Sequence, residues 1–167
     1  MPDFKPISRD AIPAALEKAE RYRLLAEPAL AESICLDVLA VDAHNQQALV
    51  MLLLALTDQF PDGAAGCVRQ AEAVVPQIEG EYERLYYSGI IWERRGHARA
   101  LQGGPGSTVA SYAYLQQAMS FFEQAERLRP SGNDDAILRW NTCVRLCERF
   151  HLHPEPEELL QPVLGDD

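Results

Sequence analysis

Two cysteines and a histidine near the end of the sequence have the chemistry and the spacing of a metal site. Cys143, Cys147 and His151 follow one another at intervals of four, so they share one face of a helix that extends that far. Thiolates and imidazoles are zinc ligands, and a helical pair at this spacing can bind one ion. The two cysteines also fit the apolar face of a helix, where a free cysteine acts as a small apolar side chain. We therefore expect a core role and no cofactor, and keep a metal-binding protein as the less favoured alternative.

A group of basic residues comes just before a glycine-rich segment at 102–107. A helix that begins after this segment would present free N–H groups that could help to hold an anion. The segment lacks the Gly-Lys-Ser/Thr ending of a nucleotide-binding loop, which argues against that kind of site. We expect a solvated helix face and keep a phosphate or acidic-partner site as the alternative. The basic residues are Arg94, Arg95, His97 and Arg99.

No group of residues has the spacing of a catalytic site. Serine, histidine and aspartate occur, but no spacing places a nucleophile beside a base, and no nucleophile elbow is present. The paired carboxylates Glu157 and Glu158 fall in a polar tail. These patterns predict a protein that is not an enzyme.

The composition is that of a folded, acidic protein. Of the 167 residues, 47% are hydrophobic and 24% are charged, which excludes disorder over most of the chain. The formal net charge of -10 argues against nucleic-acid binding, because phosphates would be repelled over most of the surface. The longest apolar run, at 48–56, is far shorter than the roughly 20 residues of a membrane span, and the first residues lack a secretion-signal layout. With four scattered cysteines, these features predict a cytoplasmic protein with reduced thiols and no membrane partner.

The apolar residues recur with a helical period throughout the chain. Ile12, Leu16, Ala19 and Tyr22 follow one another at intervals of three or four, as one face of a helix requires. This helix ends before Pro28, which can open the next one, and further helices are expected at about 47–58 and 64–75. No segment alternates apolar and polar residues over the length of a strand. The sequence therefore predicts an all-α protein.

Three segments repeat the same pattern of small and large residues. In the second half of the pattern, four positions have the same spacing in all three segments. They are Ala31, Cys35, Val38 and Ala43; then Ala64, Val68, Ala71 and Pro76; then Ala118, Phe122, Ala125 and Pro130. The first half aligns in the same way: Ala15, Ala19 and Tyr22; Leu49, Leu53 and Leu56; Leu85, Gly89 and Trp92. A single unit of this kind cannot bury its apolar face alone, so successive units are expected to stack.

These marks resemble those of the tetratricopeptide repeat (TPR) family, whose unit of about 34 residues folds as a helix-turn-helix. The third copy matches best, whereas the first departs at Cys35, Val38 and Ala43 and the second at Leu53. The resemblance implies an all-α, TPR-like right-handed α-solenoid with repeats at about 10–43, 44–76 and 77–130. Residues 1–9 form an N-terminal extension, 133–150 a capping helix, and 151–167 an acidic and apolar tail.

The third copy is longer than the others, and its extra residues lie between Arg95 and Ala118. A turn is predicted around Gly104, and both flanks keep a helical composition. We therefore expect a lengthened hairpin that projects beyond the stack and packs mainly on itself.

The capping helix is expected to have one buried face and one solvent-exposed face. One hypothesis for the tail is that Leu159, Leu160 and Val163 fold back over an apolar part of the stack. The expected buried face of the helix is Ile137, Trp140, Cys143, Val144 and Cys147, with Arg139, Arg145, Glu148 and Arg149 mostly on the other side.

The resemblance also implies a concave groove lined by the first helix of each repeat. Its apolar centre with acidic neighbours suits a peptide or protein that has apolar anchors and some basic residues, although the same apolar groups could be core in a tightly curled stack. We expect a non-catalytic protein–protein interaction module that binds through this groove or through the hairpin around Gly104. The alternative is a self-associating, homodimeric structural subunit. The expected partner-binding residues are Arg23, Val50, Leu54, Glu83, Tyr86, Ile90, Glu93 and Arg139.

Overall fold

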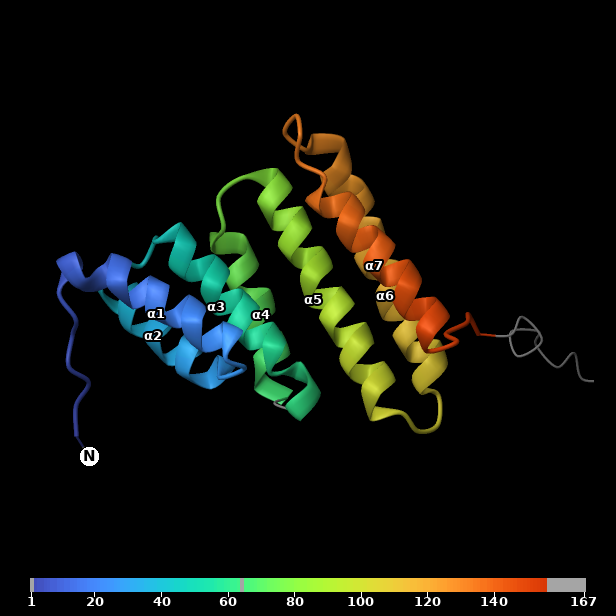
Figure 1. The fold of residues 1–167 in the computed structure, drawn as a ribbon, viewed down its shortest axis with the longest axis horizontal. Coiled ribbons are helices and arrows are strands. Elements are labelled where there is room, and N and C mark those ends of the chain that lie inside the picture. Colours follow the sequence, from blue (N-terminus) through green and yellow to red (C-terminus); the bar gives the residue numbers. More distant parts are fainter. Residues whose placement is uncertain (1, 64, 156–167) are drawn as a thin grey trace, which may run out of the picture.

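The computed structural model describes residues 2–63 and 65–155, and every regular element in that part of the chain is a helix (Figure 1). This confirms the all-α fold that the sequence predicts. The expected fold-back of the tail at Leu159, Leu160 and Val163 lies outside the described residues. Within the described part, the short 3-10 helices are η1 (Arg9–Ala11), η2 (Phe60–Asp62) and η3 (Val75–Gln77). The α-helices are α1 (Ile12–Leu24), α2 (Pro28–Val41), α3 (Gln46–Asp58), α4 (Ala65–Val74), α5 (Glu81–Gln102), α6 (Ser107–Leu128) and α7 (Asp135–Arg149).

Prolines and polar caps set the ends of several helices. Pro28 is the first residue of α2, where its missing N–H leaves no hydrogen bond unmade, and it prevents α1 from continuing. Asn45 precedes α3, and its side-chain oxygen accepts a hydrogen bond of 2.9 Å from the backbone N–H of Ala48. Ala26, in the turn between α1 and α2, has a left-handed backbone with a φ of 58°. These local features divide the chain close to the breaks that the sequence predicts.

Helices that follow one another in the sequence also pack against one another. α1 contacts α2, α2 contacts α3, α3 contacts α4, and the long α5 lies along α6, which contacts α7. The odd-numbered helices, which we call the first helices, also touch in succession from α1 to α3, α5 and α7. Figure 1 shows this progression, from α1 and α2 at one end of the molecule to α6 and α7 at the other. Such contacts are typical of helical hairpins placed side by side.

Small residues allow the helices to approach closely at the repeated positions. Ala19 of α1, Ala31 of α2 and Ala125 of α6 are completely buried. On α5, a Cβ atom added to Gly89 would lie only 2.4 Å from Cε1 of Phe122, so the absence of a side chain leaves room for this ring. Phe122 itself is completely buried. The small and large residues that alternate in the sequence are therefore the residues that pack together in the core.

The third hairpin is lengthened, as the sequence predicts. α5 and α6 have 22 residues each, and the turn that joins them lies at the lower end of the molecule in Figure 1. Gly103, Gly104 and Gly106 all have positive φ angles in this turn, a conformation that glycine adopts without strain. Arg99 donates hydrogen bonds to the carbonyl oxygens of Gly103, at 2.7 Å, and Pro105, at 3.2 Å. The glycine-rich segment is thus a closed structural turn.

The helix α7, which the sequence predicts to cap the stack, is rotated relative to the face predicted from its sequence. Cys143 is buried as expected, but Ala136 is buried with it and Trp140 is 38% exposed. Arg139, which the pattern places mostly on the wet side, reaches α5 and pairs with Glu93 at 3.1 Å. The predicted face is therefore wrong in part, because close packing at Ala136 and the ion pair of Arg139 turn Trp140 outward.

We expect Gly89→Ala to lower the free energy of unfolding by about 1–3 kcal/mol, because the added methyl group overlaps the buried ring of Phe122. Gly66→Ala in α4 is the matched control, since its added Cβ meets nothing within 4 Å and alanine is the better helix former. Thermal and urea unfolding followed by circular dichroism measure both effects. Equal stability of the two variants would contradict the close packing of α5 on α6.

Candidate functional site

The residues expected to bind a partner lie on the first helices, which touch in succession. α1 contributes Arg23, α7 contributes Arg139, and the remaining residues come from α3 and α5. Ile90 and Glu93, both on α5, are buried, whereas the others are partly exposed. We use the name first-helix face for the partly exposed set, which consists of Arg23, Val50, Leu54, Glu83, Tyr86 and Arg139.

A chain of ion pairs joins the first helices to one another. Asp58, at the end of α3, accepts a hydrogen bond of 2.7 Å from Nε of Arg23 on α1, and its other oxygen lies 3.6 Å from Nη1 of Arg94 on α5. Glu93, the neighbour of Arg94, accepts a hydrogen bond of 3.1 Å from Nη1 of Arg139 on α7. Each ion pair joins two different helices, so these partly buried contacts fix how the first helices lie against one another.

Glu93 is buried, with an exposed fraction of 3%. Burial raises the pKa of its carboxyl group, and the positive charges of Arg139 and Arg94 oppose that rise. Burial alone would lower the pKa of Arg139, but Glu93 and Tyr86 together raise it above its ordinary value. Oε2 of Glu93 has no hydrogen-bond partner within the described part of the chain. Glu93 and the completely buried Ile90 therefore hold the face together and offer no open surface to a partner.

Half-buried aromatic rings lie at the centre of the first-helix face. The ring of Tyr86 stacks on that of Tyr82 with centroids 5.9 Å apart, and it meets Tyr87 edge-on at 5.2 Å. Its third neighbour is the buried ring of Phe122, at 5.9 Å. Burial, together with the nearby Tyr86 and Glu83, raises the pKa of Tyr87 to about 12. The Tyr87 hydroxyl is protonated at neutral pH, as an ordinary tyrosine is, and the raised pKa keeps it protonated to a more alkaline pH.

The basic residues before the glycine-rich turn have partners within the fold. The guanidinium carbon of Arg95 lies 4.2 Å from the ring centroid of Trp92 and 4.7 Å from that of Tyr114. Its Nη1 also lies 3.4 Å from Oε1 of Glu72 on α4. These contacts favour a structural role over an anion site. The other three residues have partners as well: Arg94 pairs with Asp58, Arg99 closes the turn, and His97 packs on Phe150 with ring centroids 5.8 Å apart.

The structure does not place His151 on the helix of Cys143 and Cys147, as the less favoured metal-binding alternative requires. α7 ends at Arg149, so His151, with a φ of 51°, lies beyond the helix that carries Cys143 and Cys147. Burial raises the pKa of the Cys143 thiol far above its usual range, which keeps the thiol protonated. Among the residues that the structure describes, no group of three or more histidine, cysteine, aspartate or glutamate side chains could hold a metal ion. This geometry favours the core role of the cysteines.

Comparisons with models of protein families, with curated protein sequences and with solved structures find no match for this chain. No helix among the described residues has both the length and the apolar character needed to cross a membrane. The geometry of the first-helix face and the repeated sequence pattern are therefore the features of this chain that point to a function.

His97 on α5 should give the stability of the fold a measurable dependence on pH. Burial, and then the charges of Arg94 and Arg149, lower the pKa of its imidazole below the ordinary value of 6.5. The folded protein thus binds this proton less tightly than the unfolded chain does. The free energy of unfolding should therefore contain a contribution that is complete above about pH 6.5 and is lost as the pH falls through the lowered pKa.

Guanidinium unfolding of the wild type and His97→Gln across this pH range measures that contribution, which the variant should lack. Glu93 acts in the opposite direction, because a raised pKa makes stability fall as the pH rises. Glu93 is present in both proteins, so its effect cancels in the comparison. An identical pH dependence of the two proteins would contradict the assignment to His97.

Proposed function

We propose that this chain is a non-catalytic protein-binding module of the TPR type, a right-handed α-solenoid that binds a protein or peptide on its first-helix face. The repeated sequence marks support this, because they coincide with buried residues such as Ala31, Phe122 and Ala125. The successive contacts of α1, α3, α5 and α7 add support, since the first helices line the concave side of a TPR-like stack. The cysteines of the described chain are free thiols, which fits the reducing cytoplasm that we propose as its compartment.

One observation carries the proposal: half-buried apolar and aromatic side chains lie on a face that ion pairs hold in place. Leu54 packs against two core clusters and remains partly exposed, and Val50 precedes it by one turn of α3. Tyr86 adds a ring that three aromatic neighbours support. Side chains ordered in this way lose little conformational entropy when a partner covers them. They are therefore suited to receive the apolar anchor residues of a partner.

Charge narrows the class of partner. The arginines of the face, Arg23 and Arg139, are already paired with Asp58 and Glu93, which largely neutralise them. Glu83 lies on the same face, and the whole chain has a formal net charge of -10. A partner with some basic residues is therefore favoured over an acidic one.

A random peptide library displayed on phage provides an unbiased test of the first-helix face. We expect the selected peptides to combine apolar residues with lysine or arginine. Glu83→Arg should weaken their binding by about tenfold or more, because it replaces attraction by repulsion at the face. Titration calorimetry with the selected peptides measures this loss.

Glu123→Arg on α6 is the matched control, since it makes the same change of charge at an exposed side chain on an even-numbered helix, outside the first-helix face. Circular dichroism verifies that both variants are folded. Selected peptides without basic residues, or an equal loss of affinity in the control, would contradict the proposed site. Cross-links from bound peptides to residues near Gly104 alone would assign binding to the third hairpin.

A further inference from the structure

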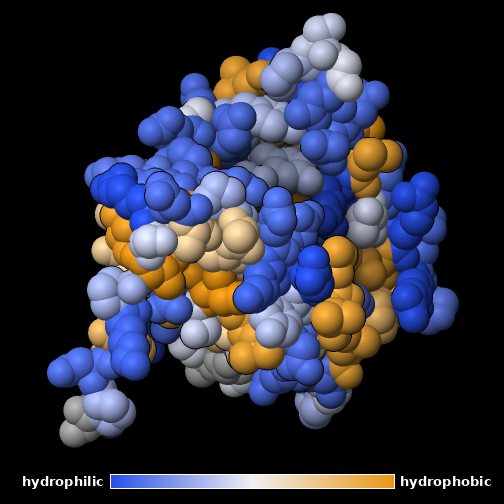
Figure 2. All heavy atoms as spheres, turned by 60° about the vertical axis from the view of Figure 1, so that its left-hand side comes forward, coloured by the Kyte–Doolittle hydropathy of each residue, from blue (hydrophilic) through white to orange (hydrophobic). Residues whose placement is uncertain are grey.

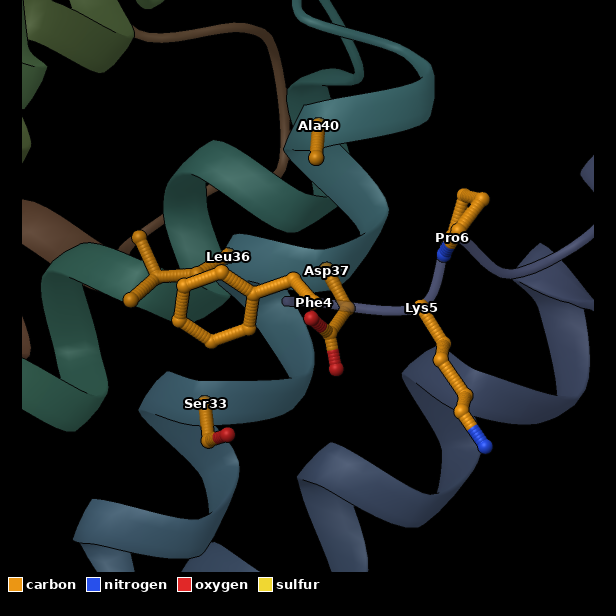
Figure 3. Close-up of a pocket in the computed structure, with 7 residues that line it drawn as sticks. All are labelled: Phe4, Lys5, Pro6, Ser33, Leu36, Asp37 and Ala40. Atoms are coloured by element: carbon orange, nitrogen blue, oxygen red, sulfur yellow. The ribbon is translucent and has the colours of Figure 1, made fainter. Parts of the chain in front are cut away.

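The chain segment before α1 and the outer side of α2 border an open hollow of about 400 Å³. Phe4, Lys5 and Pro6 line it from the segment, and Leu36, Asp37 and Ala40 line it from α2. Figure 3 shows the ring of Phe4 over α2 beside Leu36, with Ala40 further along the helix. The hollow therefore combines apolar walls with one basic and one acidic side chain.

The two large apolar side chains of this hollow are open to solvent. Phe4 is 97% exposed and Leu36 is 51% exposed. Water contact with a whole aromatic ring is unfavourable, and Phe4 touches too little of its own chain to avoid it. The hollow beside the ring is space that a further apolar group could occupy.

The large apolar side chains that adjoin Leu36 toward α4 are buried. Leu36 also lines a second hollow, of about 290 Å³, together with Leu52 and Leu56 of α3 and Val74 of α4. Figure 2 is turned to bring this end of the molecule forward, and it shows apolar side chains gathered in patches between polar ones. Phe4 and Leu36 are therefore the large apolar side chains that this surface offers to a partner.

We infer that this surface binds a second copy of the chain, with Phe4 of each copy in the hollow beside Leu36 of the other. A two-fold interface uses the same patch on both copies, so the patch must be complementary to itself. The shape of this patch is complementary to itself, because the projecting ring of Phe4 and the hollow lie next to each other. Both copies therefore bury a ring and fill a hollow in one symmetric contact.

The patch is also complementary to itself in charge. Lys5 and Asp37 both line the hollow, and the ion pairs found in the described part of the chain do not join them. In the two-fold arrangement Lys5 of each copy faces Asp37 of the other, which gives two ion pairs across the interface. Seven residues line the hollow, far fewer than the roughly 20–30 residues on each side of a stable complex, so the dimer is weak and depends on concentration.

Sedimentation equilibrium over a wide range of protein concentration tests this inference. The mean mass of the wild type should rise toward twice the monomer mass as the concentration increases. Phe4→Ala and Leu36→Ala should weaken the dimer by about tenfold or more, and both residues are exposed enough for the fold to tolerate the change. Circular dichroism verifies the fold of each variant.

A mixing experiment tests the charge pairing directly. Lys5→Glu and Asp37→Lys should each weaken self-association, because like charges then face each other across the interface. An equal mixture of the two variants should regain the association of the wild type, since the introduced glutamate faces the introduced lysine and the native Lys5 faces the native Asp37. Lys18→Glu and Glu17→Lys on α1 are matched controls that make the same changes of charge at exposed positions away from the hollow.

A wild type that remains monomeric at every concentration would overturn the inference, and so would a mixture that fails to regain association. The inference is independent of the proposed partner site, because Glu83→Arg should leave the dimer unchanged. Loss of the dimer in Glu83→Arg would place the second copy on the first-helix face and would also overturn it.

Discussion

The close approach of α5 and α6 at Gly89 is the contact on which the rest of the structure depends. Phe122 occupies the space where a side chain of residue 89 would be, and its ring then supports Tyr86 on the first-helix face. A bulkier residue would separate the two longest helices and remove that support. The first hairpin uses the same principle, since Ala19 and Ala31 are completely buried. Core packing therefore determines both the spacing of the helices and the shape of the surface that they present.

Ion pairs orient the helices that core packing has brought together. Asp58 is able to pair with Arg23 and Arg94 because α1, α3 and α5 already lie side by side. Ion pairs that are partly exposed to water contribute little free energy on their own, so they orient the first helices without being the reason that the helices meet. Glu93 is different, because its burial would be costly without Arg139. The pair between α5 and α7 thus links the position of α7 to the core of the hairpin formed by α5 and α6.

Much of the fold could be predicted from the sequence because its signals are local. Pro28 marks the start of a helix, and the glycines around Gly104 mark the turn of the long hairpin. The rotation of α7 and the role of Asp58 could not be predicted, because the ion pairs of Arg139 and Asp58 join residues 46 and 35 positions apart. A helical period defines a buried face only to within about 100°, which cannot decide between neighbours on the same side of a helix. The exposure of Phe4 could not be predicted either, since a single aromatic residue outside the repeats has no periodic context.

The two surfaces proposed for binding come from different sets of helices and have different chemistry. The first-helix face has aromatic and apolar groups with an acidic neighbour, and its arginines are neutralised within the fold. The surface around Phe4 and Leu36 belongs to the N-terminal segment and to α2, and its charges are balanced between Lys5 and Asp37. In the helical stack that we propose, each hairpin contributes one helix to each of two such sides. Contact with a second copy through α2 would therefore leave the first helices of both copies free, and the dimer would present two partner sites whose combined affinity depends on the distance between them.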